Sequence, residues 1–291
     1  FLERVDHRSG PPPGGFSQFF PARKRGKIMT LTVGLAQMAL KKGAVADNLA
    51  DLKTWAHRAA ARDVDLLLVP ELWASGYDLE NSSEYARRAG TGIFKEMKNL
   101  ADELGIMIGG SLLEEAEGRI YNTFSLYGKG QEVYYRKIHL FRLLEEEKWL
   151  HGGERLVAAH IQGHKIGLAV CYDLRFPEMF RAYAAAGVEM ILLVAEWPQR
   201  RIIHWRKLLP ARAIENQLYV AAVNKVGSSQ GEALGGRSAV IDPWGEVLVE
   251  GQQEEELLTA VIDFTEVEKA RRWIPVLEDR NPRAYQDLEE S

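Results

Sequence analysis

Residues 165–178 have the sequence Lys-Ile-Gly-Leu-Ala-Val-Cys-Tyr-Asp-Leu-Arg-Phe-Pro-Glu, in which a short apolar run ends at Cys171 and Pro177 follows shortly after. Such a run predicts a strand that is buried on both faces. Proline is favoured at the first position of a helix, so we expect a helix from Pro177 to about Ala186. The same order of strand and helix recurs over residues 190–216. Alternating strands and helices predict an α/β domain in which helices cover the sheets.

The chain after Met29 continues this alternation and shows no internal repeat or linker, so we expect a single domain over residues 29–291. The first helix is expected to run to about Arg62 with Asp47 as its N-cap, because an aspartate side chain accepts hydrogen bonds from the free N–H groups of a first turn. The remaining predicted helices are 92–104 and 204–216, and the predicted strands are 31–38, 66–69, 106–108, 123–127, 132–136, 165–171, 190–194, 218–223, 238–241, 246–249 and 257–262.

The first 28 residues differ in composition from the rest, with a proline run at residues 11–13 and a basic cluster at residues 23–27. We expect residues 1–28 to be a disordered extension or a leader added for expression, with Met29 as the native start. A basic targeting arm is the alternative.

The overall composition excludes several classes of protein. The 291 residues include 37 basic and 41 acidic side chains, so the formal net charge of −4 gives no electrostatic reason to expect nucleic acid or an anionic membrane as a partner. The apolar runs are far shorter than the roughly 20 residues of a membrane-spanning helix. The single cysteine, Cys171, excludes an internal disulfide and a cysteine-based zinc site. We therefore expect a soluble, cytoplasmic protein.

Three polar residues lie at the ends of predicted strands: Glu71, Lys137 and Cys171. The carboxyl ends of strands in an α/β sheet face the ligand crevice, and a helix N-terminus or a nearby cation there is expected to lower the pKa of a thiol. Each residue alone has a structural alternative, since a free cysteine often packs in a core, a glutamate often forms an ion pair and a lysine is often solvated. Together they supply a nucleophile, a general base and a cation for an oxyanion.

The sequence motifs around these residues resemble those of the nitrilase superfamily of carbon–nitrogen hydrolases. They are PELW at residues 70–73, YRKIHLF at 135–141 and CYDLRFPE at 171–178, and the resemblance covers about residues 31–285. It implies a four-layer αββα sandwich and a Glu-Lys-Cys triad formed by Glu71, Lys137 and Cys171. A second active-site glutamate is implied among residues 145–147, with Glu146 favoured by an ungapped comparison.

Further sequence motifs resemble those of the ω-amidase branch of that superfamily. They lie at residues 195–198, 204–205, 211–217 and 242–247 and in the tail from Ile274 to Tyr285. The branch implies hydrolysis of the terminal amide of 2-oxoglutaramate or 2-oxosuccinamate through a cysteine thioester, without a metal or organic cofactor. The sequence contains no motif for phosphate, dinucleotide or zinc binding that would point elsewhere.

In this chemistry Lys137 and the backbone N–H of Tyr172 are expected to hold the oxyanion. A dicarboxylate monoamide also needs a cation for its distal carboxylate, for which Arg175 is our first candidate beside Arg200 and Arg201. A structural ion pair of Arg175 with the neighbouring Glu178 is the alternative. The other expected substrate-binding residues are Glu196 and Trp197.

Other functions remain open from the residues. An N-carbamoyl amino acid amidohydrolase would use the same triad, and a true nitrilase, a non-catalytic interaction module of this fold and a redox-sensing thiol are further alternatives. The resemblance also implies a homodimer or a larger homo-oligomer, with the tail over about residues 265–291, around Trp273–Tyr285, in the interface.

Overall fold

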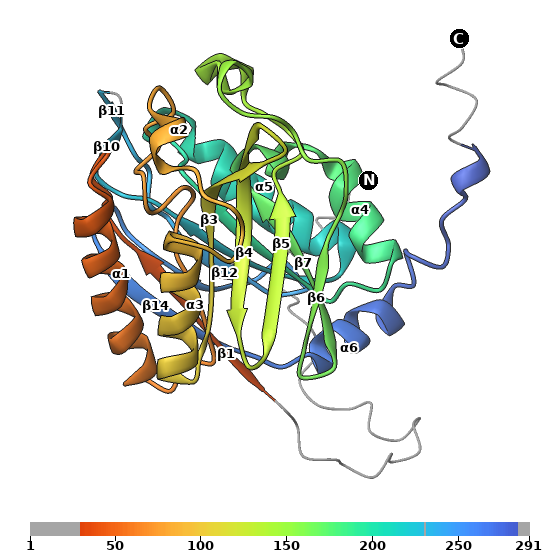
Figure 1. The fold of residues 1–291 in the computed structure, drawn as a ribbon. Coiled ribbons are helices and arrows are strands. Elements are labelled where there is room, and N and C mark those ends of the chain that lie inside the picture. The colour runs from red at the N-terminus through yellow and green to blue at the C-terminus, as the bar shows by residue number, and fades with distance from the viewer. Residues whose placement is uncertain (1–29, 230, 285–291) are drawn as a thin grey trace.

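Two six-stranded sheets form the centre of the molecule (Figure 1). The computed structural model describes residues 30–229 and 231–284, so the expected leader over residues 1–28 and the end of the tail, including Tyr285, lie outside the described residues. The first sheet has the order β14 (Glu256–Ile262), β1 (Leu31–Gln37), β2 (Leu66–Leu68), β3 (Met107–Ala116), β4 (Arg119–Gly128) and β5 (Gln131–Arg136). The second has the order β13 (Val247–Glu250), β12 (Ala239–Ile241), β9 (Tyr219–Asn224), β8 (Met190–Ala195), β7 (His164–Val170) and β6 (Ala158–Ile161).

Each sheet has a parallel centre and antiparallel edges. Strands β1, β2 and β3 pair in parallel in the first sheet, as do β7, β8 and β9 in the second. The remaining pairs in both sheets are antiparallel. Parallel strands need crossover connections, and helices in these connections cover the outer faces of the sheets.

Helices α1 (Val45–Ala60) and α3 (Ile93–Leu104) pack on the first sheet, whereas α4 (Pro177–Ala185) and α5 (Ile202–Asn216) lie on the side of the second. The two inner faces of the sheets pack against each other. This arrangement confirms the four-layer αββα sandwich that the sequence analysis expects. The shorter elements are α2 (Ser82–Tyr85), α6 (Thr265–Trp273), β10 (Ser228–Ser229), β11 (Glu232–Ala233) and the 3-10 turns η1 (Arg142–Leu144), η2 (Glu146–Lys148), η3 (Cys171–Arg175) and η4 (Gln199–Arg201).

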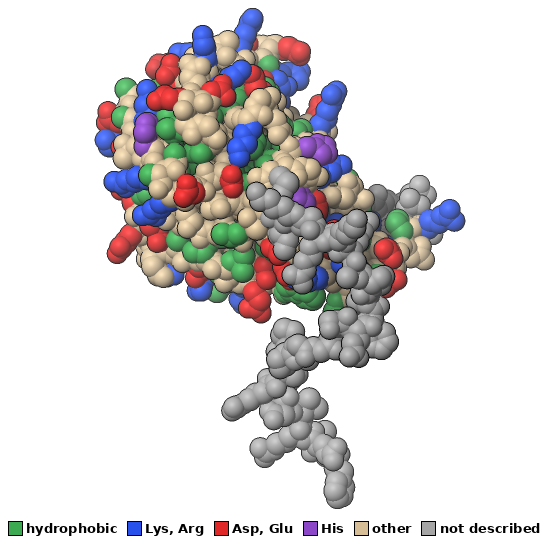
Figure 2. Space-filling model, turned by 90° about the horizontal axis from the view of Figure 1, so that it is seen from below, with side chains coloured by type: hydrophobic (Ala, Val, Ile, Leu, Met, Phe, Trp, Pro, Cys, Tyr) green, Lys and Arg blue, Asp and Glu red, His purple; other side chains and the backbone are tan. Residues whose placement is uncertain are grey.

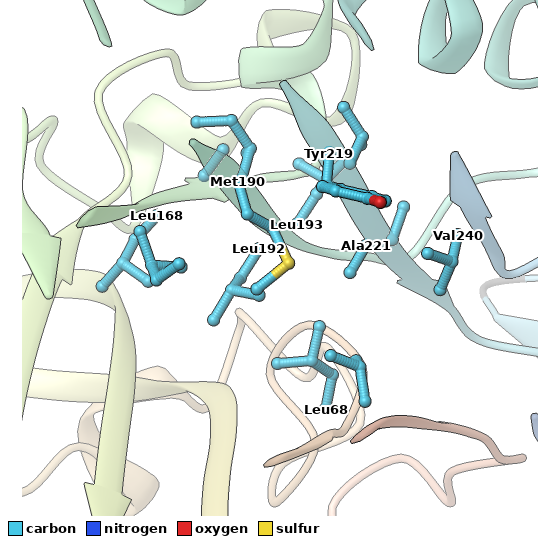
Figure 3. Packing of buried hydrophobic residues seen from close by; sticks show 14 of the residues in the cluster. Leu68, Leu168, Met190, Leu192, Leu193, Tyr219, Ala221 and Val240 are labelled. Atoms are coloured by element: carbon cyan, nitrogen blue, oxygen red, sulfur yellow. The ribbon is translucent and has the colours of Figure 1, made fainter. Parts of the chain in front are cut away.

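The strand β2 shows how one short apolar run fills two layers of the core. Successive side chains of a strand point to opposite faces, so Leu66 and Leu68 enter the core between the sheets while Leu67 enters the core under α1 and α3. In Figure 3, Leu68 points from the first sheet toward Leu192 of β8 in the second. This close packing fixes the position of one sheet on the other.

Three of the expected elements differ clearly in the structure. The helix expected at Asp47 already begins at Val45, because Asn48 ties the preceding segment by hydrogen bonds to both the N–H and the C=O of Lys41. Asp47 lies in the first turn and pairs with the Lys41 side chain instead of capping. The strands expected at 106–108 and 123–127 are parts of a hairpin of two ten-residue strands, β3 and β4.

Surface charges are mixed on the face shown in Figure 2, where Lys and Arg side chains lie among Asp and Glu side chains. In the described part of the chain, no helix is both long enough and apolar enough to cross a membrane.

Candidate active site

The structure brings Glu71, Lys137 and Cys171 together at the carboxyl ends of strands from both sheets. Lys137 follows β5 of the first sheet, Cys171 follows β7 of the second, and Glu71 lies just beyond β2. Glu71 and Lys137 have no exposed surface, and Cys171 exposes 9% of its own. Only the sulfur-bearing residue of the three is therefore open to a ligand.

The Glu71 carboxylate is fixed by donors on both of its oxygens. Its Oε1 accepts hydrogen bonds from Lys137 Nζ at 2.9 Å and from Asn122 Nδ2 at 2.8 Å. Its Oε2 accepts from the backbone N–H of Glu196 at 3.0 Å. The Cys171 thiol lies close enough to this carboxylate for each group to shift the pKa of the other. Glu71 is therefore placed to act as a base toward the thiol.

Lys137 lies between two carboxylates. Besides its contact with Glu71, its Nζ donates to Oε1 of Glu146 at 2.8 Å, and Glu146 is fully buried. The backbone N–H of Phe141 donates to Oε2 of Glu146 at 2.9 Å, and the Tyr77 hydroxyl donates to its Oε1. These contacts set the direction of the lysine ammonium.

Of the three candidate glutamates at residues 145–147, the structure places Glu146 beside Lys137. Glu145 and Glu147 are both exposed, and Glu145 pairs with Lys148 at the surface. Tyr77, which also lines the cavity, is not among the residues that the sequence analysis singles out. It lies in the loop after Glu71, where no apolar pattern or motif identifies a buried phenol.

The resting protonation of the thiol differs from the sequence expectation. Burial raises the pKa of the Cys171 thiol well above its ordinary value, and the negative charge of Glu71 adds to this effect, while Lys137 opposes it. The expected lowering by a helix N-terminus does not occur, because the 3-10 turn η3 separates Cys171 from the start of α4 at Pro177. The thiol therefore needs a base to become a nucleophile.

The neighbouring groups respond to the same environment. Burial raises the pKa of the Glu71 carboxyl, with Lys137 opposing and Glu146 reinforcing the shift. For Lys137, burial acts to lower the pKa, but the carboxylates of Glu146 and Glu71 outweigh it and hold the pKa well above its usual value. Lys137 is therefore a permanent cation at neutral pH.

The backbone at Cys171 adopts a left-handed conformation, with φ of 45°. Asp173 holds this turn: its Oδ2 accepts from the Val170 N–H at 2.9 Å and from the Tyr135 hydroxyl at 2.7 Å. Its Oδ1 accepts from the backbone N–H of His139 at 3.1 Å and lies 2.8 Å from His139 Nδ1. Asp173 thereby joins the segment after Lys137 to the segment around Cys171.

A cavity of about 530 Å³ opens over the sulfur of Cys171. The expected residues Tyr172, Arg175, Glu196 and Trp197 all contribute to its wall. Its remaining lining residues come mainly from the loops after β5 and β8 and from the β10–β11 hairpin; they are Tyr77, Phe141, Leu144, Pro198, Arg200, Arg201, Ser229, Gly231, Glu232, Ala233 and Leu234.

Glu196 forms an ion pair with Lys225, a residue that is not among the candidates predicted from the sequence. Its Oε2 accepts from Lys225 Nζ at 3.0 Å, and both side chains are almost completely buried. Burial raises the pKa of the Glu196 carboxyl, and Lys225 opposes this shift. The backbone carbonyl of Glu196 lies 3.9 Å from Cys171 Sγ. One residue therefore contacts the thiol and Glu71 through its backbone and presents a paired carboxylate to the cavity.

Arg175 lies over the Trp197 ring in the cavity wall. Its guanidinium carbon lies 4.7 Å from the centre of the Trp197 ring, and both Nη atoms lie 3.3 Å from Nδ1 of His204. Within the described part of the chain Arg175 forms no ion pair with Glu178, so the alternative of a structural pair between these neighbours is wrong. Among the described residues, no group of three or more His, Cys, Asp or Glu side chains is placed to hold a metal ion.

Comparison with known proteins identifies relatives over almost the whole described chain. Residues 32–272 match the family described as carbon-nitrogen hydrolase. The chain is 37% identical to a 2-oxoglutaramate amidase from Bacillus subtilis, over 88% of this chain and 100% of that protein. It is 31% identical to an omega-amidase from Mus musculus, over 87% of this chain and 97% of that protein.

Solved structures share the same architecture. A CN-hydrolase superfamily protein from Xanthomonas campestris, with an arsenic adduct in its active site, is similar with a TM-score of 0.82 and 31% identity, covering 87% of this chain and 98% of that one. An amidase mutant from Nesterenkonia, in which the acetamide moiety of fluoroacetamide is attached to the active-site cysteine, is similar with a TM-score of 0.79 and 27% identity, covering 89% and 97%.

Proposed function

This chain belongs to the carbon–nitrogen hydrolase family, and from that premise we propose that it hydrolyses the terminal amide of a small dicarboxylate monoamide, resembling 2-oxoglutaramate, to the free acid and ammonia. One observation carries the proposal: the thiol of Cys171 opens to the cavity beside the buried carboxylate of Glu71, which accepts a hydrogen bond from the ammonium of Lys137. A nucleophile, a base and a cation in this geometry suit attack on an amide carbonyl.

In the first step Cys171 Sγ attacks the amide carbon, and the thiol proton passes to Glu71. The carbonyl oxygen becomes an oxyanion, which Lys137 Nζ and the backbone N–H of Tyr172 stabilise. A donor of this kind typically contributes about a hundredfold or more to the rate. The protonated resting thiol fits this step, because the proton leaves the sulfur only as the new carbon–sulfur bond forms.

The intermediate then collapses. Protonated Glu71 delivers its proton to the amide nitrogen, the carbon–nitrogen bond breaks and ammonia leaves a thioester on Cys171. Water attacks the thioester carbon while Glu71 takes a proton from it, and the oxyanion again forms at Lys137. The carbon–sulfur bond breaks, the thiol recovers its proton and the acid product departs. Glu146 acts in both halves by holding the ammonium of Lys137 in place.

The wall of the cavity supports an acidic substrate. Arg175, Glu196 and Trp197 are proposed to contact the carbon chain and its distal end, and the cavity of about 530 Å³ suits a small molecule. The names of the relatives from Bacillus subtilis and Mus musculus point to the same substrate class.

We propose further that the enzyme works in the cytoplasm as a homodimer. A reducing compartment keeps the single catalytic thiol, Cys171, free of oxidation. Trp273 and Ile274, at the end of α6, expose 63% and 52% of their surfaces and offer an apolar contact in the tail that is expected to form the interface.

The test is ammonia release from 2-oxoglutaramate, succinamate, glutamine, N-carbamoyl-alanine and a simple nitrile. We expect turnover of the first two by the wild type and none by Cys171→Ala, which thermal melting should show to be folded. Preference for N-carbamoyl-alanine would assign the triad to the alternative amidohydrolase. Retention of most activity by Cys171→Ala would exclude the thiol mechanism.

A further inference from the structure

The charged residues in the cavity wall are mostly neutralised by partners. Glu196 is paired with Lys225, and Arg200 forms an ion pair with Glu232 of β11. Each pair is neutral overall, so neither presents a net charge to a ligand in the cavity. A charged substrate must therefore be recognised by the side chains in the wall that lack a partner of opposite charge.

Arg201 is such a side chain. It is half-buried, and its guanidinium carbon lies 5.1 Å from the centre of the Phe141 ring. Among residues 30–229 and 231–284, no carboxylate, carbonyl or other protein acceptor hydrogen-bonds to its guanidinium, which carries five N–H donors. A half-buried guanidinium whose N–H groups have no protein acceptor keeps these donors available for an anionic ligand in the cavity.

Arg175 differs from Arg201 in how its donors are used. Both of its Nη atoms face His204, and the plane of the guanidinium covers Trp197. Its charge adds to the positive potential of the cavity, but fewer N–H groups remain for a bidentate contact with a carboxylate.

The backbone of Arg201 is held firmly in the 3-10 turn η4. Its carbonyl accepts a hydrogen bond from Nε1 of the buried Trp197 at 2.9 Å, and its N–H donates to the carbonyl of Pro198 at 3.1 Å. Trp197 is also expected to contact substrate. Its hydrogen bond therefore fixes the backbone from which the Arg201 side chain extends.

We propose that Arg201 binds the distal carboxylate of the substrate and thereby selects monoamides of dicarboxylic acids over neutral amides. This assignment rests on the proposed amidase function, because it names the substrate contact of the same site. It replaces Arg175 as the main carboxylate ligand and gives Arg175 a supporting role through its charge and its packing on Trp197.

The kinetic test compares succinamate with the neutral amide butyramide. For Arg201→Gln we expect kcat/KM for succinamate to fall by roughly 10- to 100-fold, the range for loss of charge-assisted hydrogen bonds, with little change for butyramide. Arg206→Gln is the matched control, because the exposed Arg206 pairs with Glu250 of β13 and does not line the cavity. Equal losses on both amides, or a selective loss with Arg175→Gln alone, would overturn the proposal.

A binding measurement separates this assignment from the amidase proposal. Calorimetric titration of succinamate into Cys171→Ala protein needs no turnover, so it reports recognition even where no hydrolysis is detected. We expect Arg201→Gln in this background to weaken binding of succinamate by roughly 10- to 100-fold and to leave binding of butyramide unchanged. Unchanged affinity for succinamate would overturn the role of Arg201 while leaving the thiol mechanism intact. Absence of turnover by the wild type, together with selective weakening here, would overturn only the mechanism.

Discussion

The chemistry of single residues in this site is governed by burial. Cys171 and Glu71 are both shifted toward their neutral forms by removal from water, and Lys137 stays charged because two carboxylates face it. A thiol that is neutral at rest is poorly reactive until a base accepts its proton. The coupling of thiol and carboxylate therefore replaces the preformed thiolate that a cysteine at a helix N-terminus would supply.

The raised pKa of Glu71 predicts the acid side of the pH profile. Only ionised Glu71 accepts the thiol proton, so kcat/KM should fall as the pH drops through a value above the ordinary glutamate pKa of about 4.3. Glu146 contributes to that shift through its negative charge. Glu146→Gln should therefore move the acid limb to lower pH, as measured on butyramide, which has no group that titrates in this range.

Glu147→Gln provides the matched control, because this glutamate is exposed and its removal should leave the acid limb in place. The limb belongs to the coupled group of Glu71, Lys137, Glu146 and Cys171 rather than to one residue. A limb at or below the ordinary glutamate range in the wild type would contradict the raised pKa.

At the level of elements, the turn η3 holds Cys171, the proposed nucleophile. Cys171 has a left-handed backbone, and Asp173 accepts four hydrogen bonds that connect this turn to β5, to the end of β7 and to His139. A side chain other than glycine adopts a positive φ only where its surroundings compensate the strain. The buried aspartate supplies that compensation.

Replacement of Asp173 tests this role of the turn. Asp173→Ala leaves several buried donors without an acceptor, so we expect a loss of about 2–4 kcal/mol in the free energy of unfolding and a fall in kcat. Asp263→Ala is the control, since Asp263 accepts from Thr265 at the exposed start of α6 and its loss should cost about 1 kcal/mol. Urea unfolding and kcat check both variants; a stable Asp173→Ala protein with full kcat would contradict the assignment.

Elements with a clear apolar period could be predicted from the sequence, and those that carry buried polar residues could not. The strand at 66–69 and the helix at 92–104 were predictable because their side chains follow the core. The β3–β4 hairpin was recognised only in part, because Ser111, Glu114 and Asn122 are buried polar residues that interrupt its apolar alternation outside the predicted strands. Its turn has positive φ at Glu117 and Gly118, a feature that lets two residues connect twisted strands.

The same reason limits the prediction of the site. Glu71, Lys137 and Cys171 were singled out because each lies at the end of a predicted strand within a recognisable sequence motif. Tyr77 and Lys225 were not, since their partners Glu146 and Glu196 are 69 and 29 residues away in the chain. Contacts at such separation depend on how the two sheets pack, and no local pattern encodes them.

At the scale of the whole molecule, the proposed active site is completed by the packing of one sheet on the other. Glu71 and Lys137 come from the first sheet, and Cys171 and Glu196 come from the second. The hydrogen bond from the Glu196 N–H to Glu71 crosses this junction. The core between the sheets therefore sets the distances on which the chemistry depends.

The exposed end of α6 predicts the assembly of the whole molecule. Trp273 and Ile274 are large apolar side chains in water, and their burial against a second copy would remove the cost of this exposure. We expect sedimentation equilibrium to give twice the 32.8 kDa of one chain, and the double variant Trp273→Ser, Ile274→Ser to shift the mass toward one chain. Leu156→Ser, which changes an exposed apolar residue outside this segment, should leave the mass unchanged. A monomeric wild type would exclude the homodimer, and a double variant that stays dimeric would place the interface elsewhere on the surface.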